Sequence, residues 1–123
     1  MFQVKEVVSG KYKVSILFKD GVCEYDAQFE DFKSDYRTEL VQIESRIRND
    51  LAEGQLLPKT KFRTIPNFYK GHKVYEIKTK RLRVYLIQDS NHGKIIAFMG
   101  KKSNQEKDYR KLKALMELYF ENQ

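Results

Sequence analysis

The side chains best suited to chemistry in this sequence are cations that repeat every second residue along neighbouring predicted strands. Lys78 lies on one strand and Arg83 on the next. Arginine can clamp two phosphate oxygens, and a lysine among other cations can act as an acid or a base. Cleavage of RNA through its own 2′-hydroxyl needs a base, an acid and positive charge around the phosphorus, but no metal and no protein nucleophile. The spacing fits such a site, but spacing alone favours a polar sheet face on which Lys78 and Arg83 pair with Glu76.

Further candidate groups lie around the end of a third predicted strand. Lys101 and Lys102 follow it directly, beside the start of a final helix whose N-terminus adds partial positive charge. Tyr109, one turn into that helix, can stack on a base or donate a proton. The two histidines, His72 and His92, lie in predicted turns, where each is either a general base or simply solvated. The sequence has no glycine-rich phosphate loop, no Gly-x-Ser-x-Gly elbow and no metal-ligand spacing, so we expect no metal and no cofactor.

The net charge is concentrated in the second half of the chain. The 123 residues carry a net charge of +7, but residues 1–58 hold 8 Lys+Arg against 11 Asp+Glu, whereas residues 59–123 hold 16 against 6. Nine of these cations lie within 59–83, including Lys73, Lys80 and Arg81, against the single acid Glu76. A basic patch of this density attracts a polyanion such as RNA, or an acidic protein segment, although it also fits a solvated surface.

The elements that position these residues predict one α+β domain over 1–123, with helices packed on an antiparallel sheet. A β-hairpin region is predicted over 1–25: alternation over 4–8, a Ser9-Gly10 turn and a β-rich run over 12–18 are followed by the Asp20-Gly21 turn and a short second arm at 22–25. An apolar stripe then predicts a helical region over 26–54, either one long helix or a helical hairpin broken near Ser34-Asp35. Residues 55–73, with both prolines, are expected to form a loop. An antiparallel three-strand meander over 74–99 and a C-terminal helix over 103–121 complete the domain.

The faces of the meander follow from the same alternation. Its apolar sets, Tyr75 with Ile77 and Leu82 with Val84 and Leu86, are expected to face the helices, which leaves Lys78 and Arg83 on the opposite, open face. The lone Cys23 excludes an internal disulfide and a zinc finger. No apolar run approaches the length of about 18 residues that a membrane span needs, so we expect a cytoplasmic protein without a membrane partner.

The meander and its cations resemble the RelE/ParE superfamily of bacterial toxins, and most of all its HigB-like, phage-related branch. The likeness rests on the run from Val74 to Leu86, on the segment from Ile95 to Lys102 and on the amphipathic helix after it. In that branch, strands of the type Tyr-Glu-(Ile/Leu)-(Lys/Arg) and Arg-(Val/Leu)-(Phe/Tyr) recur, together with a strand end of the type (Phe/Gly)-x-Lys-Lys. The likeness covers about residues 60–120, and it implies a RelE-like fold. The region 1–25 is longer than the family's single N-terminal strand.

The resemblance implies the toxin of a type II toxin–antitoxin system: a ribosome-dependent mRNA endonuclease that a separately encoded antitoxin neutralises through an acidic or amphipathic segment. Its catalytic positions correspond to Lys78, Arg83, Lys102 and Tyr109, and we expect RNA phosphate contacts from Lys73, Lys80, Arg81 and Lys101. This sequence departs from the family at Glu76, where some members have a cation, at Lys102, which replaces an arginine, and at Tyr109, which lies one residue later. A ParE-like inhibitor of DNA gyrase and a non-catalytic RNA- or protein-binding module of the same fold are the alternatives.

Overall fold

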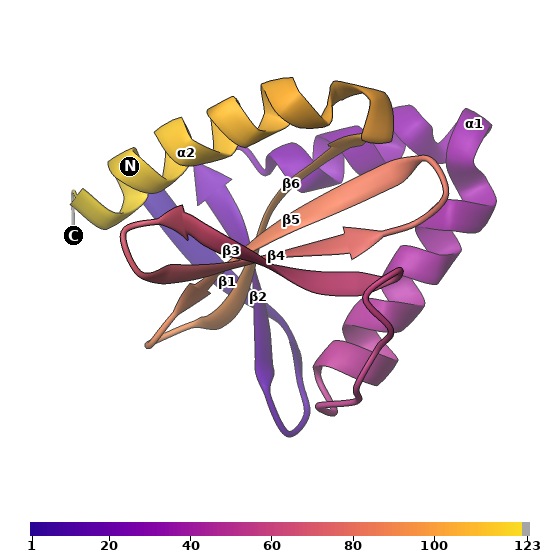
Figure 1. Ribbon diagram of the computed structural model, residues 1–123, viewed down its shortest axis with the longest axis horizontal. Coiled ribbons are helices and arrows are strands. Elements are labelled where there is room, and N and C mark those ends of the chain that lie inside the picture. The colour runs from indigo at the N-terminus through magenta and orange to yellow at the C-terminus, as the bar shows by residue number, and fades with distance from the viewer. Residues whose placement is uncertain (122–123) are drawn as a thin grey trace.

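The computed structural model describes residues 1–121, which form a six-stranded mixed sheet with helices on both faces (Figure 1). The α+β class expected from the sequence is confirmed. The elements follow in the order β1 (Phe2–Ser9), β2 (Lys13–Lys19), α1 (Glu24–Ser45), η1 (Arg46–Leu51), β3 (Phe62–Tyr69), β4 (His72–Lys78), β5 (Leu82–Asp89), β6 (Gly93–Lys101), η2 (Lys102–Asn104) and α2 (Gln105–Glu121).

The strands are arranged in the order β1-β2-β6-β5-β4-β3. Neighbouring strands are antiparallel except β2 and β6, which run parallel and pair from Val14 opposite Lys94 to Ile16 opposite Ile96. The expectation of a purely antiparallel sheet is therefore wrong. The parallel pair joins the N-terminal hairpin to the meander, so that segments 80 residues apart become neighbours.

Residues 55–73 are not simply a loop, because β3 occupies their second half and extends the meander to four strands. Pro66 lies inside β3, at the outer edge of the sheet. An edge strand tolerates proline because one of its hydrogen-bonding sides faces no partner. The β3–β4 register is also interrupted between Ile65 and Tyr69, where Asn67 adopts a φ of 51°. The proline that suggested a loop thus marks an edge strand with an irregularity.

The N-terminal region differs from the expected hairpin in its second arm. The turn at Asp20-Gly21 is confirmed, with φ values of 51° and 81° and reciprocal backbone hydrogen bonds between Lys19 and Val22. The predicted arm over 22–25 is reduced to one isolated bridge, because α1 already begins at Glu24. The other predicted hairpin, with its turn after Ser9, does form and joins β1 to β2.

The helical region is one continuous helical segment with a kink, not a helical hairpin. Tyr36 has non-helical backbone angles, φ −131° and ψ 27°, within α1, and the π-helical turn η1 follows α1 directly. The segment then turns at Gly54, with φ 73°. The predicted apolar stripe faces one side of the sheet, where it packs among the residues of the first hydrophobic cluster: Phe29, Phe32, Tyr36, Leu40, Ile43, Ile47 and Leu51.

The opposite side of the sheet is covered by α2, which crosses above the strands in Figure 1. Leu112, Met116 and Tyr119 of α2 are buried in a second cluster together with sheet residues such as Tyr85 and Ile87. The expected apolar set from Tyr75 to Leu86 does pack in the first cluster, on the α1 side. However, the expectation of an open face behind it is wrong, because each face of the sheet carries a helix.

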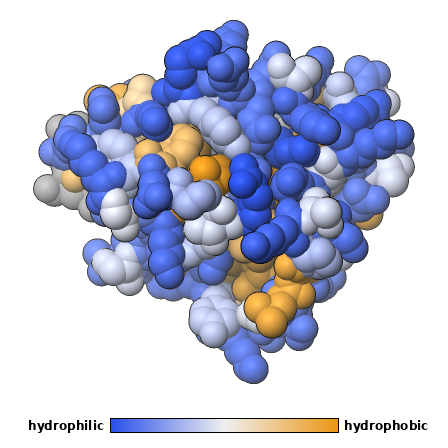
Figure 2. All heavy atoms as spheres, in the orientation of Figure 1, coloured by the Kyte–Doolittle hydropathy of each residue, from blue (hydrophilic) through white to orange (hydrophobic). Residues whose placement is uncertain are grey.

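The outer surface is largely hydrophilic in the view of Figure 2, with a few small apolar patches. Leu56, in the connection between η1 and β3, is the most exposed of the large apolar side chains in the described part of the chain, at 99%. Within residues 1–121, no helix combines the length and the apolar character that crossing a membrane requires.

Candidate nucleic-acid interface

Four of the predicted site residues line one cavity of about 420 Å³ at the end of the sheet. We call it the basic pocket; its lining consists of Tyr36, Lys80, Arg81, Lys101, Lys102 and Ser103. The lysines and Arg81 come from two chain segments, the β4–β5 turn and the end of β6 with the start of η2. The backbone N–H of Lys102 donates to the carbonyl of Arg81 at 2.8 Å, which holds the two segments together.

The kink of α1 supplies the aromatic wall of the basic pocket. The guanidinium of Arg81 lies 4.3 Å from the centre of the Tyr36 ring, and its Nη2 donates to the carbonyl of Asp35 at 3.1 Å. The same guanidinium donates through Nε to Glu39 at 2.7 Å, and the Arg81 backbone N–H donates to the second oxygen of that carboxylate, also at 2.7 Å. Arg81 therefore fastens the β4–β5 turn to α1 at the kink.

Glu39 is buried, and it is the carboxylate on which this fastening depends. Burial disfavours its charged form, but the hydrogen bonds from Thr79 and Arg81 together outweigh that effect and lower the pKa of Glu39. Glu39 is therefore ionised at neutral pH, and it neutralises one of the four cations of the basic pocket.

The three lysines of the basic pocket keep their charge available to a ligand. Lys80, Lys101 and Lys102 are exposed. None of them takes part in the ion pairs found within residues 1–121. The ammonium of Lys101 lies 6.0 Å from the centre of the Tyr36 ring. Three unpaired ammonium groups around a concave surface produce a positive potential that favours an anionic group.

Lys78 and Arg83 lie directly opposite each other in the register of β4 and β5. Lys78 is half-buried, whereas Arg83 is only 5% exposed. The Nη1 of Arg83 donates to the carbonyls of Thr79 and Leu82 at 2.7 and 2.8 Å. The Nε of Arg83 is buried and has no acceptor among the described residues. Part of this guanidinium thus stabilises the β4–β5 turn.

Tyr109 belongs to a separate cluster around Glu76, which we call the Glu76 cluster (Arg63, Glu76, Gln105 and Tyr109). The Glu76 carboxylate is 1% exposed and accepts from Arg63 Nε at 2.6 Å, from Gln105 Nε2 at 2.7 Å and from the Tyr109 hydroxyl at 3.1 Å. Burial and, next, the negative charge of Glu76 raise the pKa of Tyr109. Tyr109 therefore keeps its proton at neutral pH and cannot serve as a base there.

Two further buried polar groups lie between β5, β6 and the first turns of α2. The hydroxyl of Tyr85 and the Oδ2 of Asp108 have no hydrogen-bond partner among residues 1–121. Burial raises the pKa of both groups, and the neighbouring charge of Asp108 adds to the effect on Tyr85. The Asp108 carboxylate lies so close to Gly100 that a Cβ at position 100 would clash with it. Gly100 is in turn the register partner of Arg83.

The remaining predicted contact, Lys73, lies away from the basic pocket, near the other end of β4. Of the two histidines, His72 stacks its ring on Phe120 with ring centres 3.7 Å apart, and the backbone carbonyl of His92 accepts a hydrogen bond from the Ser15 hydroxyl. The described part of the chain contains no group of three or more His, Cys, Asp or Glu side chains that could hold a metal ion.

Sequence reasoning missed Tyr36, Arg63 and Gln105 as members of these clusters. Tyr36 continues an apolar stripe that predicts core packing, and nothing in the local sequence indicates that α1 is kinked at this residue. Arg63 had a usable signal, because a strand over 62–69 would place it opposite Glu76, as the β3–β4 register does. Gln105 depends on how α2 lies on the sheet, which the sequence does not specify.

Comparison of the chain with protein-family models, with curated proteins and with solved structures finds no match.

Proposed function

We propose that this protein is the toxin of a type II toxin–antitoxin system and cleaves mRNA on the ribosome through the 2′-hydroxyl of the substrate. The observation that carries the proposal is the basic pocket, in which Lys80, Lys101 and Lys102 surround a cavity with the Tyr36 ring on one side. Unpaired cations beside an aromatic ring are the combination that proteins use to bind single-stranded nucleic acid. The order of a helical region, a meander and a final helix also supports the proposal, because it is the order that the resemblance implies.

The roles of the individual residues follow from their surroundings. Lys80, Lys101 and Lys102 hold the phosphate and stabilise the charge that develops on it. Lys78, half-buried opposite Arg83, is the proposed proton-transfer group. Arg83 and Tyr109 are engaged with internal partners, so we assign them to positioning in the present arrangement. The same lysines would bind the acidic segment of a cognate antitoxin in the bacterial cytoplasm.

A second candidate function is RNA binding without cleavage, and the Glu76 cluster favours it. Glu76 accepts a hydrogen bond from the hydroxyl of Tyr109, one of the four residues expected to be catalytic. Arg83, another of the four, donates hydrogen bonds through Nη1 to two backbone carbonyls. A protein that binds mRNA tightly but leaves it intact would fit these contacts.

Controlled expression tests the proposal. We expect the wild type to slow growth and to yield cleaved mRNA on translating ribosomes, and the Lys101→Ala/Lys102→Ala variant to lose at least tenfold in cleavage. The control Lys107→Ala/Arg110→Ala removes the same charge from exposed positions of α2 and should retain activity. A wild type that leaves both growth and mRNA unchanged refutes cleavage. If it still binds RNA, the second candidate function is supported.

A further inference from the structure

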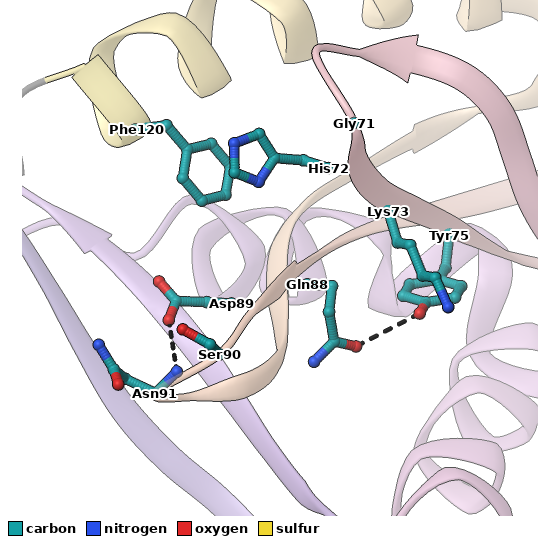
Figure 3. A pocket seen from close by; sticks show the side chains of 9 residues that line it. All are labelled: Gly71, His72, Lys73, Tyr75, Gln88, Asp89, Ser90, Asn91 and Phe120. Atoms are coloured by element: carbon teal, nitrogen blue, oxygen red, sulfur yellow. Dashed lines mark hydrogen bonds between the residues drawn. The ribbon is translucent and has the colours of Figure 1, made fainter.

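A second cavity, of about 470 Å³, lies at the opposite end of the sheet, between the β3–β4 and β5–β6 turns. Figure 3 shows Lys73 and Tyr75 on the same side of β4, with the Tyr75 hydroxyl donating to Gln88 of β5. His72 stacks on Phe120 at the other side of this cavity (Figure 3). The proposed function makes no use of this region.

Two lysines converge beside this cavity without a carboxylate between them. The ammonium of Lys94, the register neighbour of Gln88, lies 5.0 Å from the centre of the Tyr75 ring. Lys94 is half-buried, and burial together with the charge of Lys73 lowers its pKa. Neither lysine belongs to an ion pair within the described residues. Two cations held close together, one of them partly desolvated, gain free energy when an anion binds between them.

The nearest acid of the cavity is already engaged. The carboxylate of Asp89 accepts from the Tyr119 hydroxyl at 2.7 Å and from the backbone N–H of Asn91 at 2.7 Å. These partners hold the carboxylate on the α2 side of the sheet, whereas Lys73, Tyr75 and Gln88 lie on the α1 side by strand alternation. The positive charge of Lys73 and Lys94 is therefore left for an external group.

The N-terminal hairpin adds an exposed aromatic ring to these cations. Tyr12 lies at the connection between β1 and β2, is 56% exposed, and its ring centre is 5.8 Å from the ammonium of Lys94. The backbone N–H of Tyr12 donates to the carbonyl of Ala52 at 2.8 Å, and its ring lies against Gly54. The hairpin is thus fixed to the end of η1, and the ring is held in place beside Lys94.

We propose that Lys73, Lys94 and Tyr12 form a second RNA site, which binds a backbone phosphate and a stacked base of the strand whose other end enters the basic pocket. The proposal rests on the function proposed above. Lys73 lies at the start of β4 and Lys80 just past its end, roughly 23 Å away at 3.3 Å per residue. A stacked strand advances about 3.4 Å per nucleotide, so about seven nucleotides join the two sites.

Binding of single-stranded RNA of 4 and 12 nucleotides tests the proposal, with Lys73→Gln/Lys94→Gln as the variant. We expect the 12-mer to bind three- to tenfold more weakly to the variant, with the slope of log K against log salt smaller by about 1.4, because each lost contact removes about 0.7. The 4-mer, which is too short to reach both sites, should bind the variant unchanged. The charge-matched control Lys107→Gln/Arg110→Gln should bind both lengths as the wild type does.

Three further variants keep the test independent of folding. Lys73 is exposed, so Lys73→Glu alone should weaken only the 12-mer without unfolding the protein. Tyr12→Phe should retain the stacking contribution, and Tyr12→Ala should lose it. A titration with inorganic phosphate tests whether Lys73 and Lys94 bind a free anion instead of RNA. If phosphate saturates these two lysines, and if replacing them changes RNA affinity equally for both RNA lengths or not at all, the proposal is overturned.

The outcomes separate this proposal from the proposed function. If the 12-mer binds the Lys73→Gln/Lys94→Gln variant with unchanged affinity and salt slope, while Lys101→Ala/Lys102→Ala weakens both lengths, the second site is refuted and the basic pocket stands. If Lys101→Ala/Lys102→Ala has no effect while the Lys73 and Lys94 variant weakens the 12-mer, the basic pocket fails as the RNA entry site. A wild type that binds neither oligonucleotide refutes both.

Discussion

Replacing Glu76 by glutamine tests whether the Glu76 cluster holds β3, β4 and α2 together. The carboxylate belongs to β4, is 1% exposed and accepts hydrogen bonds from Arg63 of β3 and from Tyr109 and Gln105 of α2. Glutamine has nearly the same shape but no charge, and its amide group turns two N–H donors toward a site lined with donors. The variant therefore removes the charge and leaves at least one donor without an acceptor.

The size of the effect follows from these contacts. A hydrogen bond to a charged group contributes about 1.5–3 kcal/mol, and glutamine keeps part of this set as neutral bonds. The Arg63 side chain is 38% exposed, so water screens the ion pair and its guanidinium can rehydrate. We expect the free energy of unfolding to fall by about 3 kcal/mol in total, a sizeable part of the roughly 6–18 kcal/mol that a domain of this size has. The melting temperature should fall by about 10 °C.

Urea denaturation of the wild type, of Glu76→Gln and of the control Glu117→Gln measures this difference. Glu117 is exposed on α2, so its replacement should change stability by less than about 0.5 kcal/mol. A double-mutant cycle with Arg63→Gln should give a coupling energy of about 1 kcal/mol or more. A loss below about 0.5 kcal/mol for Glu76→Gln, or additive effects with Arg63→Gln, would show that the cluster does not stabilise the fold as argued here.

Three other predictions concern the same region. Gly100→Ala should destabilise the fold by about 1–3 kcal/mol in urea denaturation, because the added Cβ meets the Asp108 carboxylate. Adding Asp108→Ala to this variant should recover part of the lost stability. An equal loss with and without Asp108→Ala would contradict the clash. Asp108→Asn should raise the melting temperature at pH 7 but not at pH 3. Burial raises the folded-state pKa of Asp108 above 3.8, so the stability that its protonated form contributes is present below pH 3.8 and is lost as the pH rises through the folded pKa. Glu76→Gln should lower the pKa of Tyr109, followed by NMR of the ring carbons, because one of its two largest causes of elevation disappears; an unchanged titration would exclude that cause.

The elements that the sequence predicts well are those whose pattern is local. Two-residue alternation determines β4 to β6, and the glycine after Asp20 fixes a turn that no other local signal opposes. The apolar stripe of α1 has the helical period through its whole length, which is why it predicts the buried face even across the kink at Tyr36.

The parts that the sequence does not predict depend on pairing between distant segments. Whether residues 62–69 form a strand depends on the free edge of β4, which outweighs the low strand preference of Pro66. Alternation correctly placed Arg83 on the sheet face opposite the apolar set that packs against α1. Its burial, however, depends on α2 lying across that face. The lysines of the basic pocket were predictable from the local strand pattern. The contact of Arg81 with Glu39 and Tyr36 was not, because it joins segments that are distant in the sequence.

The parallel pairing of β2 with β6 constrains the order in which the chain can fold. Val14 of β2 pairs with Lys94 of β6, so the N-terminal hairpin leaves the ribosome long before its partner strand β6 has been synthesised. A two-stranded hairpin alone is marginally stable in water, and closing a loop of this length is slow compared with local pairing. The sheet is therefore completed only after β6 has been synthesised, and the basic pocket, which needs Tyr36, Lys80 and Lys102 together, assembles no earlier than that strand.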